Sequence, residues 1–199
     1  MRSTRNTAKE KIIDAAWELF QEVGYENATV NDIIKKSGTS RGAFYHHFRA
    51  KEDLLFQMAW YFDQGYEGWL ENQPQDQNPI TTLYKFLIFT LESVENSKYK
   101  DFLSQLYGYE VMTDGDRPII DEQRLYFKTL LSLCADARNK KLISEEWSEY
   151  TLARTLAGLG RGLTYNWLLE KCRYSLTRTA ERVFRSLLKS IAAIDVDLT

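Results

Sequence analysis

The stretch that decides the fold is TVNDIIKKSGTSRGAFYHHFRAKEDL, residues 29–54. It predicts two short helices joined at Ser37-Gly38-Thr39, because Gly38 readily adopts the positive φ that lets the second helix cross the first at a steep angle. Apolar residues on both helices would hold this crossing rigid: Val30, Ile33, Ile34, Phe44 and Phe48. Residues 29–54 therefore indicate a helix-turn-helix.

The second helix of this pair, which begins at Ser40, carries a polar outer face. In a helix-turn-helix its N-terminal end meets base edges in the major groove. Arg41 can donate two hydrogen bonds to a guanine, Thr39 can touch a thymine methyl or a phosphate, and Gly42 lets the backbone approach closely. Donors suited to phosphate oxygens follow at Tyr45, His46, His47 and Lys51. A purely structural helical hairpin is the alternative, and the grouping of these polar side chains disfavours it.

These residues resemble the TetR family of regulators. The matching pattern is G-[TS]-S-x-G-x-[FL]-Y-x-H-F-x-x-K-E-x-L, read from Gly38 to Leu54, and the preceding segment 20–30 also fits. By position, the resemblance implies phosphate contacts at Thr29, Tyr45, His47 and Lys51. It places Thr39, Ser40, Arg41 and Gly42 at the groove. It also implies a homodimer, an internal ligand pocket and, in most members, repression.

Helical periodicity continues along almost the whole chain, and no segment alternates convincingly like a strand. We therefore expect an all-α fold of about nine helices. Residues 1–50 would form a three-helix, helix-turn-helix DNA-binding domain, and residues 51–199 a larger ligand-binding and dimerisation domain. In the first helix, Thr7 with Glu10 predicts a capping box, and Gly24 predicts a left-handed stop.

A fourth helix is expected from about Lys51 towards Trp69, before the polar, proline-bounded loop 72–79. Pro118 suits the first turn of a later helix, and Ser144 and Thr177 are the expected N-caps of the last two. The remaining helices are expected at 80–96, 98–112, 118–139, 144–171 and 177–194.

Aromatic residues make up 14% of the chain, more than a helical body of this size usually needs. Some of them are expected to line a pocket for an apolar or planar molecule. For any single residue, a place in the core is the more frequent outcome. The pocket candidates, one methionine included, are Phe62, Tyr66, Trp69, Phe86, Phe89, Tyr107, Met112, Phe127 and Tyr165.

The segment 152–171 repeats apolar residues at near-heptad steps and contains Gly158 and Gly162. A glycine inside a helix costs about 1 kcal/mol against alanine, so the pair suggests close approach by another helix. Together with the last helix it would form a four-helix dimer interface, and a packing seam within one chain is the alternative. The interface candidates are Leu152, Leu156, Leu159, Gly162, Leu163, Trp167, Val183, Leu187 and Ile191.

Charge is distributed unevenly along the chain. Residues 1–51 contain nine Lys or Arg against six Asp or Glu, whereas the rest contains 17 basic and 22 acidic residues. A basic head on an acidic body is expected if only the head meets phosphate. The polar N-terminal residues and the short apolar runs indicate neither a signal peptide nor a membrane span, so we expect a cytoplasmic protein.

The sequence contains no pattern typical of catalysis or of cofactor binding, such as a nucleophile with its base or a phosphate loop. Neighbouring residues on a helix point about 100° apart, so His46 and His47 do not indicate a metal site. Cys134 and Cys172 lack metal-binding spacing and are interpreted as free thiols in the interior, with a redox pair as the alternative.

Together these features predict a sequence-specific DNA-binding transcription regulator that responds to a small molecule and is not an enzyme. Repression, relieved by an apolar or aromatic effector, is the expected mode. Its partners would be double-stranded operator DNA, the effector and a second copy of the chain. The alternatives are an activator, a helical small-molecule-binding protein, and an architectural DNA binder without a ligand.

Overall fold

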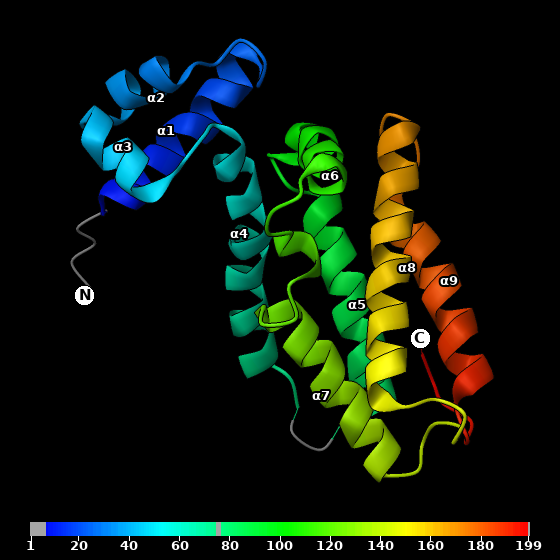
Figure 1. Cartoon of the computed structure of the whole chain (residues 1–199). Coiled ribbons are helices and arrows are strands. Elements are labelled where there is room, and N and C mark those ends of the chain that lie inside the picture. The colour runs from blue at the N-terminus through cyan, green and yellow to red at the C-terminus, as the bar shows by residue number, and fades with distance from the viewer. Residues whose placement is uncertain (1–6, 75–76, 199) are drawn as a thin grey trace. The chain divides into compact units, whose positions relative to one another are not determined.

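The computed structural model describes residues 7–74 and 77–198, which form an all-α fold as predicted (Figure 1). The sole β pairing in these ranges is one antiparallel bridge between Ile143 and Ala192. No helix within them is both long and apolar enough to cross a membrane. The helices are α1 (Ala8–Val23), α2 (Val30–Ser37), α3 (Arg41–His47), α4 (Glu52–Glu71), α5 (Pro79–Glu95), α6 (Leu103–Met112), α7 (Leu125–Asn139), α8 (Glu149–Leu169) and α9 (Leu176–Ile191), with short 3-10 turns η1 (Lys100–Phe102) and η2 (Pro118–Ile120).

The chain divides into two compact units. Unit 1 extends to Ala59 and includes Lys98–Ile119, and unit 2 comprises Trp60–Ser97 and the residues from Ile120 onward. One continuous helix, α4, contributes its first two turns to unit 1 and the remainder to unit 2. The boundary predicted at residue 50 concerns where DNA binding ends and ligand binding begins, and it stays a prediction.

The three helices α1 to α3 form the head of unit 1. The predicted capping box starts α1, with the Glu10 N–H donating to Thr7 Oγ1 at 3.2 Å and the Thr7 N–H donating to Glu10 Oε2 at 2.6 Å. Gly24 ends α1 with a φ of 83°, but its ψ of 153° is extended, so the predicted left-handed helical stop is wrong. Gly38 has φ 64° and ψ 23°, the left-handed conformation expected between α2 and α3.

Aromatic contacts join α1 to residues 98–119 within unit 1. The ring centroids of Trp17 and Tyr99 lie 4.8 Å apart, and those of Phe20 and Phe102 lie 5.6 Å apart. The Gln21 amide donates to the Lys98 carbonyl at 2.9 Å. The sequence predicts one helix over 98–112, whereas the structure has η1 followed by α6. Tyr99 and Phe102, whose rings pack against α1, lie in the stretch at η1 that precedes α6.

Unit 2 is a bundle in which α5 packs against α7 and α9, and α7 packs against α8 (Figure 1). Apolar side chains from all four helices close its core, because each helix turns one apolar stripe inward. Representative fully buried residues are Leu83, Phe86, Leu130, Leu156 and Phe184.

The start of α7 differs from the prediction. Pro118 lies in η2, and the following residues are held by distant partners before α7 begins. The Ile119 N–H donates to the Glu110 carboxylate at 3.0 Å. Arg124 has extended backbone (ψ 149°), and its side chain pairs with Asp63 on α4. Pro118 is compatible with the start of a helix. The contacts of Ile119 and Arg124 with distant partners take the place of helical hydrogen bonds here, so α7 begins only at Leu125.

The predicted N-caps of the last two helices are also wrong. Ser148 and Ser175 cap α8 and α9, rather than Ser144 and Thr177. The Ser144 N–H donates to the Ile191 carbonyl at 2.9 Å, beside the antiparallel bridge. Because this pairing holds the chain extended at Ser144, α8 starts one turn later.

Glu95, at the end of α5, binds the N-terminus of α9. Its carboxylate accepts from the Leu176 N–H at 3.1 Å and the Thr177 N–H at 2.8 Å, and from the hydroxyls of Ser175 and Thr177. A helix N-terminus favours negative charge, because its first N–H groups are unpaired. Burial raises the pKa of Glu95, but these hydrogen bonds outweigh it, so the pKa lies below its ordinary value.

Replacing Glu95 by Gln is expected to lower the free energy of unfolding by about 1–2 kcal/mol at pH 7. The loss should depend on pH: a depressed folded-state pKa stabilises above the unfolded pKa of about 4.3, and this gain disappears as pH falls through the folded pKa. Urea unfolding at about pH 7 and about pH 3 measures the loss of stability at each pH. Glu92→Gln, an exposed position on α5, is the control. If Glu95→Gln lost the same stability at both pH values, the stabilisation would not come from the charged Glu95 carboxylate at the N-terminus of α9.

Candidate functional site

The outer side of α3 presents a polar surface on a rigid base. Ile33 of α2 and Phe44 of α3 are completely buried, and Phe48 is 2% exposed, so α3 is packed firmly onto the head. The predicted groove and phosphate residues on α3 and its cap are all exposed. We call them the recognition face: Ser40, Arg41, Gly42, Tyr45, His46 and His47.

Arg41 and Tyr45 lie together on the recognition face. The Arg41 guanidinium is 5.6 Å from the centroid of the Tyr45 ring, and Tyr45 is 47% exposed. At Gly42, the nearest atom to an added Cβ would be Ser40 Oγ at 3.8 Å, so the chain itself does not require glycine here. The space beside Gly42 remains open to an approaching molecule. This arrangement presents a forked cation and a hydroxyl next to accessible backbone.

Two other predicted DNA-binding residues use their side chains within the head. Thr29 caps α2: its hydroxyl accepts from the Asp32 N–H at 3.2 Å and donates to the Asp32 carboxylate at 2.5 Å. Thr39 is half-buried, and its hydroxyl lies 2.8 Å from that of Ser37. Thr29 therefore also stabilises the start of α2, and Thr39 the turn between α2 and α3.

The start of α4 is fastened to the head at two points. The Lys51 ammonium donates to the Tyr25 carbonyl at 2.7 Å and lies 4.1 Å from the centroid of the Tyr25 ring. The indole N–H of buried Trp17 donates to the Leu54 carbonyl at 3.1 Å. Sequence reasoning missed the role of Trp17, although a buried indole always needs an acceptor. These bonds tie the start of α4 to Trp17 on α1 and to Tyr25, which follows α1.

Unit 2 brings four of the predicted pocket residues together. Tyr66 lies 5.5 Å from Phe86 and 6.1 Å from Phe89, and Trp69 stacks on Phe89 at 5.5 Å. The sequence did not single out Tyr126, whose ring is 6.1 Å from Tyr66 and 6.0 Å from Phe86. These five rings, from α4, α5 and α7, are called the aromatic cluster.

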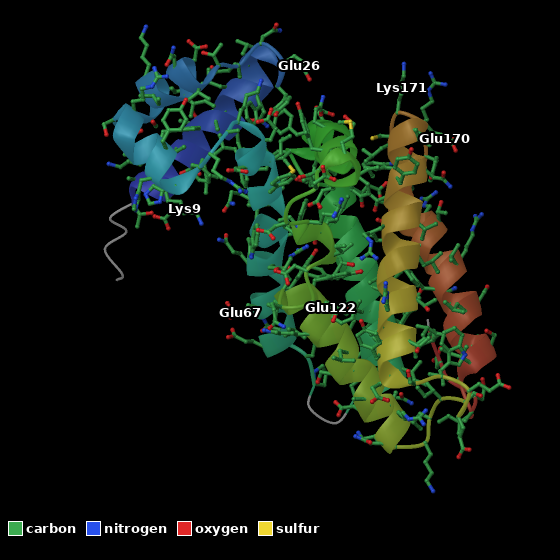
Figure 2. All side chains as sticks on the ribbon, in the orientation of Figure 1. Lys9, Glu26, Glu67, Glu122, Glu170 and Lys171 are labelled. Carbon is green, nitrogen blue, oxygen red and sulfur yellow. The ribbon has the colours of Figure 1, made fainter. Side chains whose placement is uncertain are left out.

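Three further pocket candidates in unit 2 lie outside the aromatic cluster. Phe62 is half-buried and packs on the core. Phe127 is buried beside Tyr150, whose hydroxyl donates to Glu122 at 2.6 Å, in the segment before α7 (Figure 2). Tyr165 is 49% exposed, so its predicted place in an enclosed pocket is wrong.

The remaining two candidates, Tyr107 and Met112, belong to unit 1. Tyr107 is half-buried. Met112 is 71% exposed at the end of α6, and this exposure contradicts the prediction that it lines a pocket. The sequence pattern grouped these residues by proximity along the chain, which does not determine the direction of each side chain.

A buried ion pair accompanies the aromatic cluster. The Arg124 guanidinium donates to both Asp63 carboxylate oxygens, at 2.9 and 2.7 Å, and the two side chains are 7% and 11% exposed. Burial raises the pKa of Tyr126 to about 12, against smaller lowering effects of the positive charges on Arg161 and Arg124. Sequence reasoning missed this group. The available signal was an aspartate inside the apolar run of α4.

The predicted dimer residues fall into two groups. Leu152, Leu156, Trp167 and Ile191 are buried in the core of unit 2, so they offer no surface to a second chain and that part of the prediction is wrong. Gly162 is exposed, and an added Cβ there would meet no atom within 4 Å. The others keep accessible surface along α8 and α9: Leu159, Leu163, Val183 and Leu187.

The two cysteines are free thiols. Cys134 is completely buried, and burial raises its pKa to about 12. Because the thiolate is the reactive form, this favours an inert role for Cys134. Cys172 is half-buried after the end of α8.

Comparison with known proteins points to one family. The model for bacterial regulatory proteins of the tetR family matches residues 12–58, which include most of α1, all of α2 and α3, and the start of α4. The chain is 26% identical over 202 residues to the HTH-type transcriptional regulator AcrR of Shigella flexneri, covering 94% of this chain and 92% of that one. It is 26% identical over 204 residues to the HTH-type transcriptional repressor BepR of Brucella suis, covering 97% of each.

Among solved structures, the TetR-family transcriptional repressor FadR of Thermus thermophilus has the same fold, with a TM-score of 0.74 and 22% identity over 94% of this chain and 97% of that one. The fold, the helix-turn-helix with its exposed recognition face and these relatives agree. The chain therefore belongs to the TetR family of bacterial regulatory proteins, which bind DNA to regulate transcription and are not enzymes.

Proposed function

We propose that this regulator is a homodimeric repressor that reads a specific operator and leaves it when a small molecule binds in unit 2. The observation that carries the proposal is the recognition face, in which every polar side chain is exposed while Phe44, on the same short helix, is completely buried. Polar side chains on a rigidly held helix N-terminal end are suited to base readout in a major groove.

Within this proposal, Arg41 reads a base, because an exposed guanidinium can donate two hydrogen bonds to a guanine. Ser40 and Gly42 lie at the groove, and Tyr45, His46 and His47 meet phosphates. Thr29 contributes mainly by capping α2 and Thr39 mainly by shaping the turn before α3, since their hydroxyls already have partners. Lys51 supplies positive charge to the backbone of the DNA while its ammonium also holds Tyr25.

The dimer would form on the accessible residues of α8 and α9, with Gly162 allowing close approach of a helix from the second copy. Two heads would then meet successive major grooves about 34–36 Å apart. A sedimentation mass of one chain at micromolar concentration would be incompatible with this arrangement.

The effector would bind at the aromatic cluster. Because α4 carries Tyr66 and Trp69 in unit 2 and is bonded to the head through Leu54 and Lys51, a shift of α4 changes the position of α3. Ligand and DNA must then weaken each other reciprocally, with a coupling of about 1–3 kcal/mol. The solved structure of Thermus thermophilus FadR is a complex with lauroyl-CoA, which supports an effector with an apolar part.

The test separates base readout from phosphate contact. A binding sequence is first selected from random duplex DNA with the full chain. Arg41→Ala is expected to weaken binding to it by about 1–3 kcal/mol and to relax the preference at one base position. Lys51→Ala should weaken binding to all sequences alike and reduce the salt slope by about one unit. Both changes are measured by fluorescence anisotropy at several salt concentrations.

Undiminished discrimination in Arg41→Ala would remove Arg41 from base readout. Failure of the intact chain to select any sequence would favour a small-molecule-binding protein instead. A reporter gene placed behind the selected sequence distinguishes repression from activation, since the two change its expression in opposite directions.

A further inference from the structure

The chain contains two histidines, and both lie on the recognition face. His46 and His47 are in the last turn of α3, and both side chains are exposed. Histidine is the side chain whose charge ordinarily changes between about pH 5 and pH 8. Carboxylates ordinarily lose their protons below this range, and lysine and arginine keep theirs above it. A change of pH near neutrality therefore alters the charge of the chain mainly on the surface proposed to meet DNA.

The charged residues around α3 leave the two imidazoles accessible to an outside anion. Among residues 7–74 and 77–198, no carboxylate forms an ion pair with His46 or His47. The helices packed against α3 are α1 and α2, and their cations are Lys9, Lys11, Lys35 and Lys36. Their acidic residues are Glu10, Asp14, Glu18, Glu22 and Asp32.

Four of these five carboxylates are bound to other groups: those of Glu18 and Glu22 to Lys36, that of Glu10 to Thr7 and that of Asp32 to Thr29. The fifth, Asp14, is exposed on α1. The segment after α3 carries Arg49, Lys51, Glu52 and Asp53, and the Asp53 carboxylate accepts from the Arg49 N–H at 2.7 Å. The head therefore supplies no anionic partner for either histidine in the described part of the chain.

The two imidazoles lie close to each other. Their ring centroids are 4.8 Å apart, with the ring planes at 71°. Two positive charges at such a distance repel each other, so protonating both rings costs free energy in the absence of an anion. A phosphate beside the pair would offset this repulsion, because a charged imidazole donates a charge-assisted hydrogen bond to an anionic oxygen. DNA binding would then be accompanied by an uptake of protons.

We propose that His46 and His47 make DNA binding proton-coupled: they bind backbone phosphates in their charged form, so the regulator holds DNA more tightly as the pH falls from about 8 to about 6. The proposal rests on the phosphate contacts proposed for α3 and adds a regulatory input that is separate from the effector. The sign follows from linkage, because the DNA-bound chain carries more protons than the free chain and a lower pH favours the state with more protons.

The experiment measures the DNA affinity of the full chain by fluorescence anisotropy at about pH 6 and about pH 8, at constant ionic strength. Two duplexes are used, the selected sequence and a scrambled one, because phosphate contacts carry no sequence information. The affinity for both is expected to be about tenfold or more higher at pH 6. The salt slope should also be steeper at pH 6, by about one unit for each added phosphate contact.

Three variants assign the protons. The double variant His46→Gln with His47→Gln should lose the pH dependence, since glutamine donates hydrogen bonds but carries no charge. The double variant His46→Arg with His47→Arg should bind equally at both pH values, because arginine is always charged. Lys9→Gln, which removes an exposed cation of the head, is the matched control: its affinity should still rise about tenfold at pH 6. Circular dichroism verifies that each variant is folded.

Equal affinity of the unchanged chain at both pH values would overturn the proposal while leaving sequence-specific DNA binding intact. A pH dependence that survives in the double glutamine variant would also overturn it, because the protons would then bind elsewhere. Proton-coupled binding that does not discriminate between the two duplexes would support the proposal and contradict the proposed operator reading, so the two failures are distinguishable. Absence of binding to either duplex at both pH values would overturn both.

Discussion

Replacing Asp63 by Ala is expected to lower the free energy of unfolding by about 3–5 kcal/mol. The reason is that Arg124 would remain charged and buried after losing the carboxylate that accepts two of its hydrogen bonds. Removing one partner of a buried ion pair is strongly destabilising, because the remaining charge loses the opposite charge that compensates its desolvation. Urea unfolding followed by circular dichroism measures the loss.

The matched control is Glu67→Ala, which removes an exposed carboxylate one turn further along α4 (Figure 2) and should change the stability by less than about 0.5 kcal/mol. A double variant, Asp63→Leu with Arg124→Met, is expected to recover most of the stability, because an apolar pair leaves no buried charge. If the double variant is no more stable than Asp63→Ala, the cost does not come from the charge of Arg124 left without the Asp63 carboxylate. Arg124 would then act mainly through other contacts.

Replacing Phe44 by Ala is expected to cost about 3–5 kcal/mol and to abolish operator binding. Phe44 is completely buried, and its ring lies 5.8 Å from that of Phe48, so its removal leaves a cavity under α3. Such a loss is comparable with the whole stability of a small three-helix head. Phe44→Leu keeps most of the apolar volume and should lose far less. Thermal unfolding and DNA binding are measured on the same samples.

Tyr45, next to Phe44, is expected to contribute to DNA binding rather than to stability. Tyr45 is 47% exposed, so Tyr45→Ala should change stability by about 0.5 kcal/mol or less while weakening DNA binding by about 1 kcal/mol. Two adjacent aromatic residues of α3 are thereby assigned to different tasks. If Tyr45→Ala destabilised the head as much as Phe44→Ala, the recognition face would be part of the fold rather than a binding surface.

The head was predictable from sequence because its signals are local. Gly38 adopts the left-handed conformation that its turn requires, Thr29 and Ser40 cap the helices that follow them, and the apolar residues repeat at helical spacing. Each of these effects acts over three or four residues, within one turn of a helix. The recognition face follows directly, since residues opposite the buried stripe must be exposed.

The wrong predictions for the N-caps of α8 and α9 show where local signals are insufficient. Ser144 and Ser148 are both acceptable N-caps, as are Ser175 and Thr177. The choice depended on Ile191, which pairs with Ser144, and on Glu95, which accepts hydrogen bonds at Thr177. Partners that lie far away in sequence determined which serine begins each helix.

The sequence by itself determined the all-α fold, the helix-turn-helix and the residues of α3 that face outward, because helix periodicity, caps and glycine conformations are properties of short segments. Only the tertiary structure decided that Asp63 meets Arg124, that Tyr126 joins the aromatic cluster, and that Leu152 and Leu156 lie in the core rather than at an interface. A heptad spacing indicates that two side chains share a helix face, but it does not determine which other helix covers that face. That depends on how distant segments pack to bury the most apolar surface while keeping every buried charge paired.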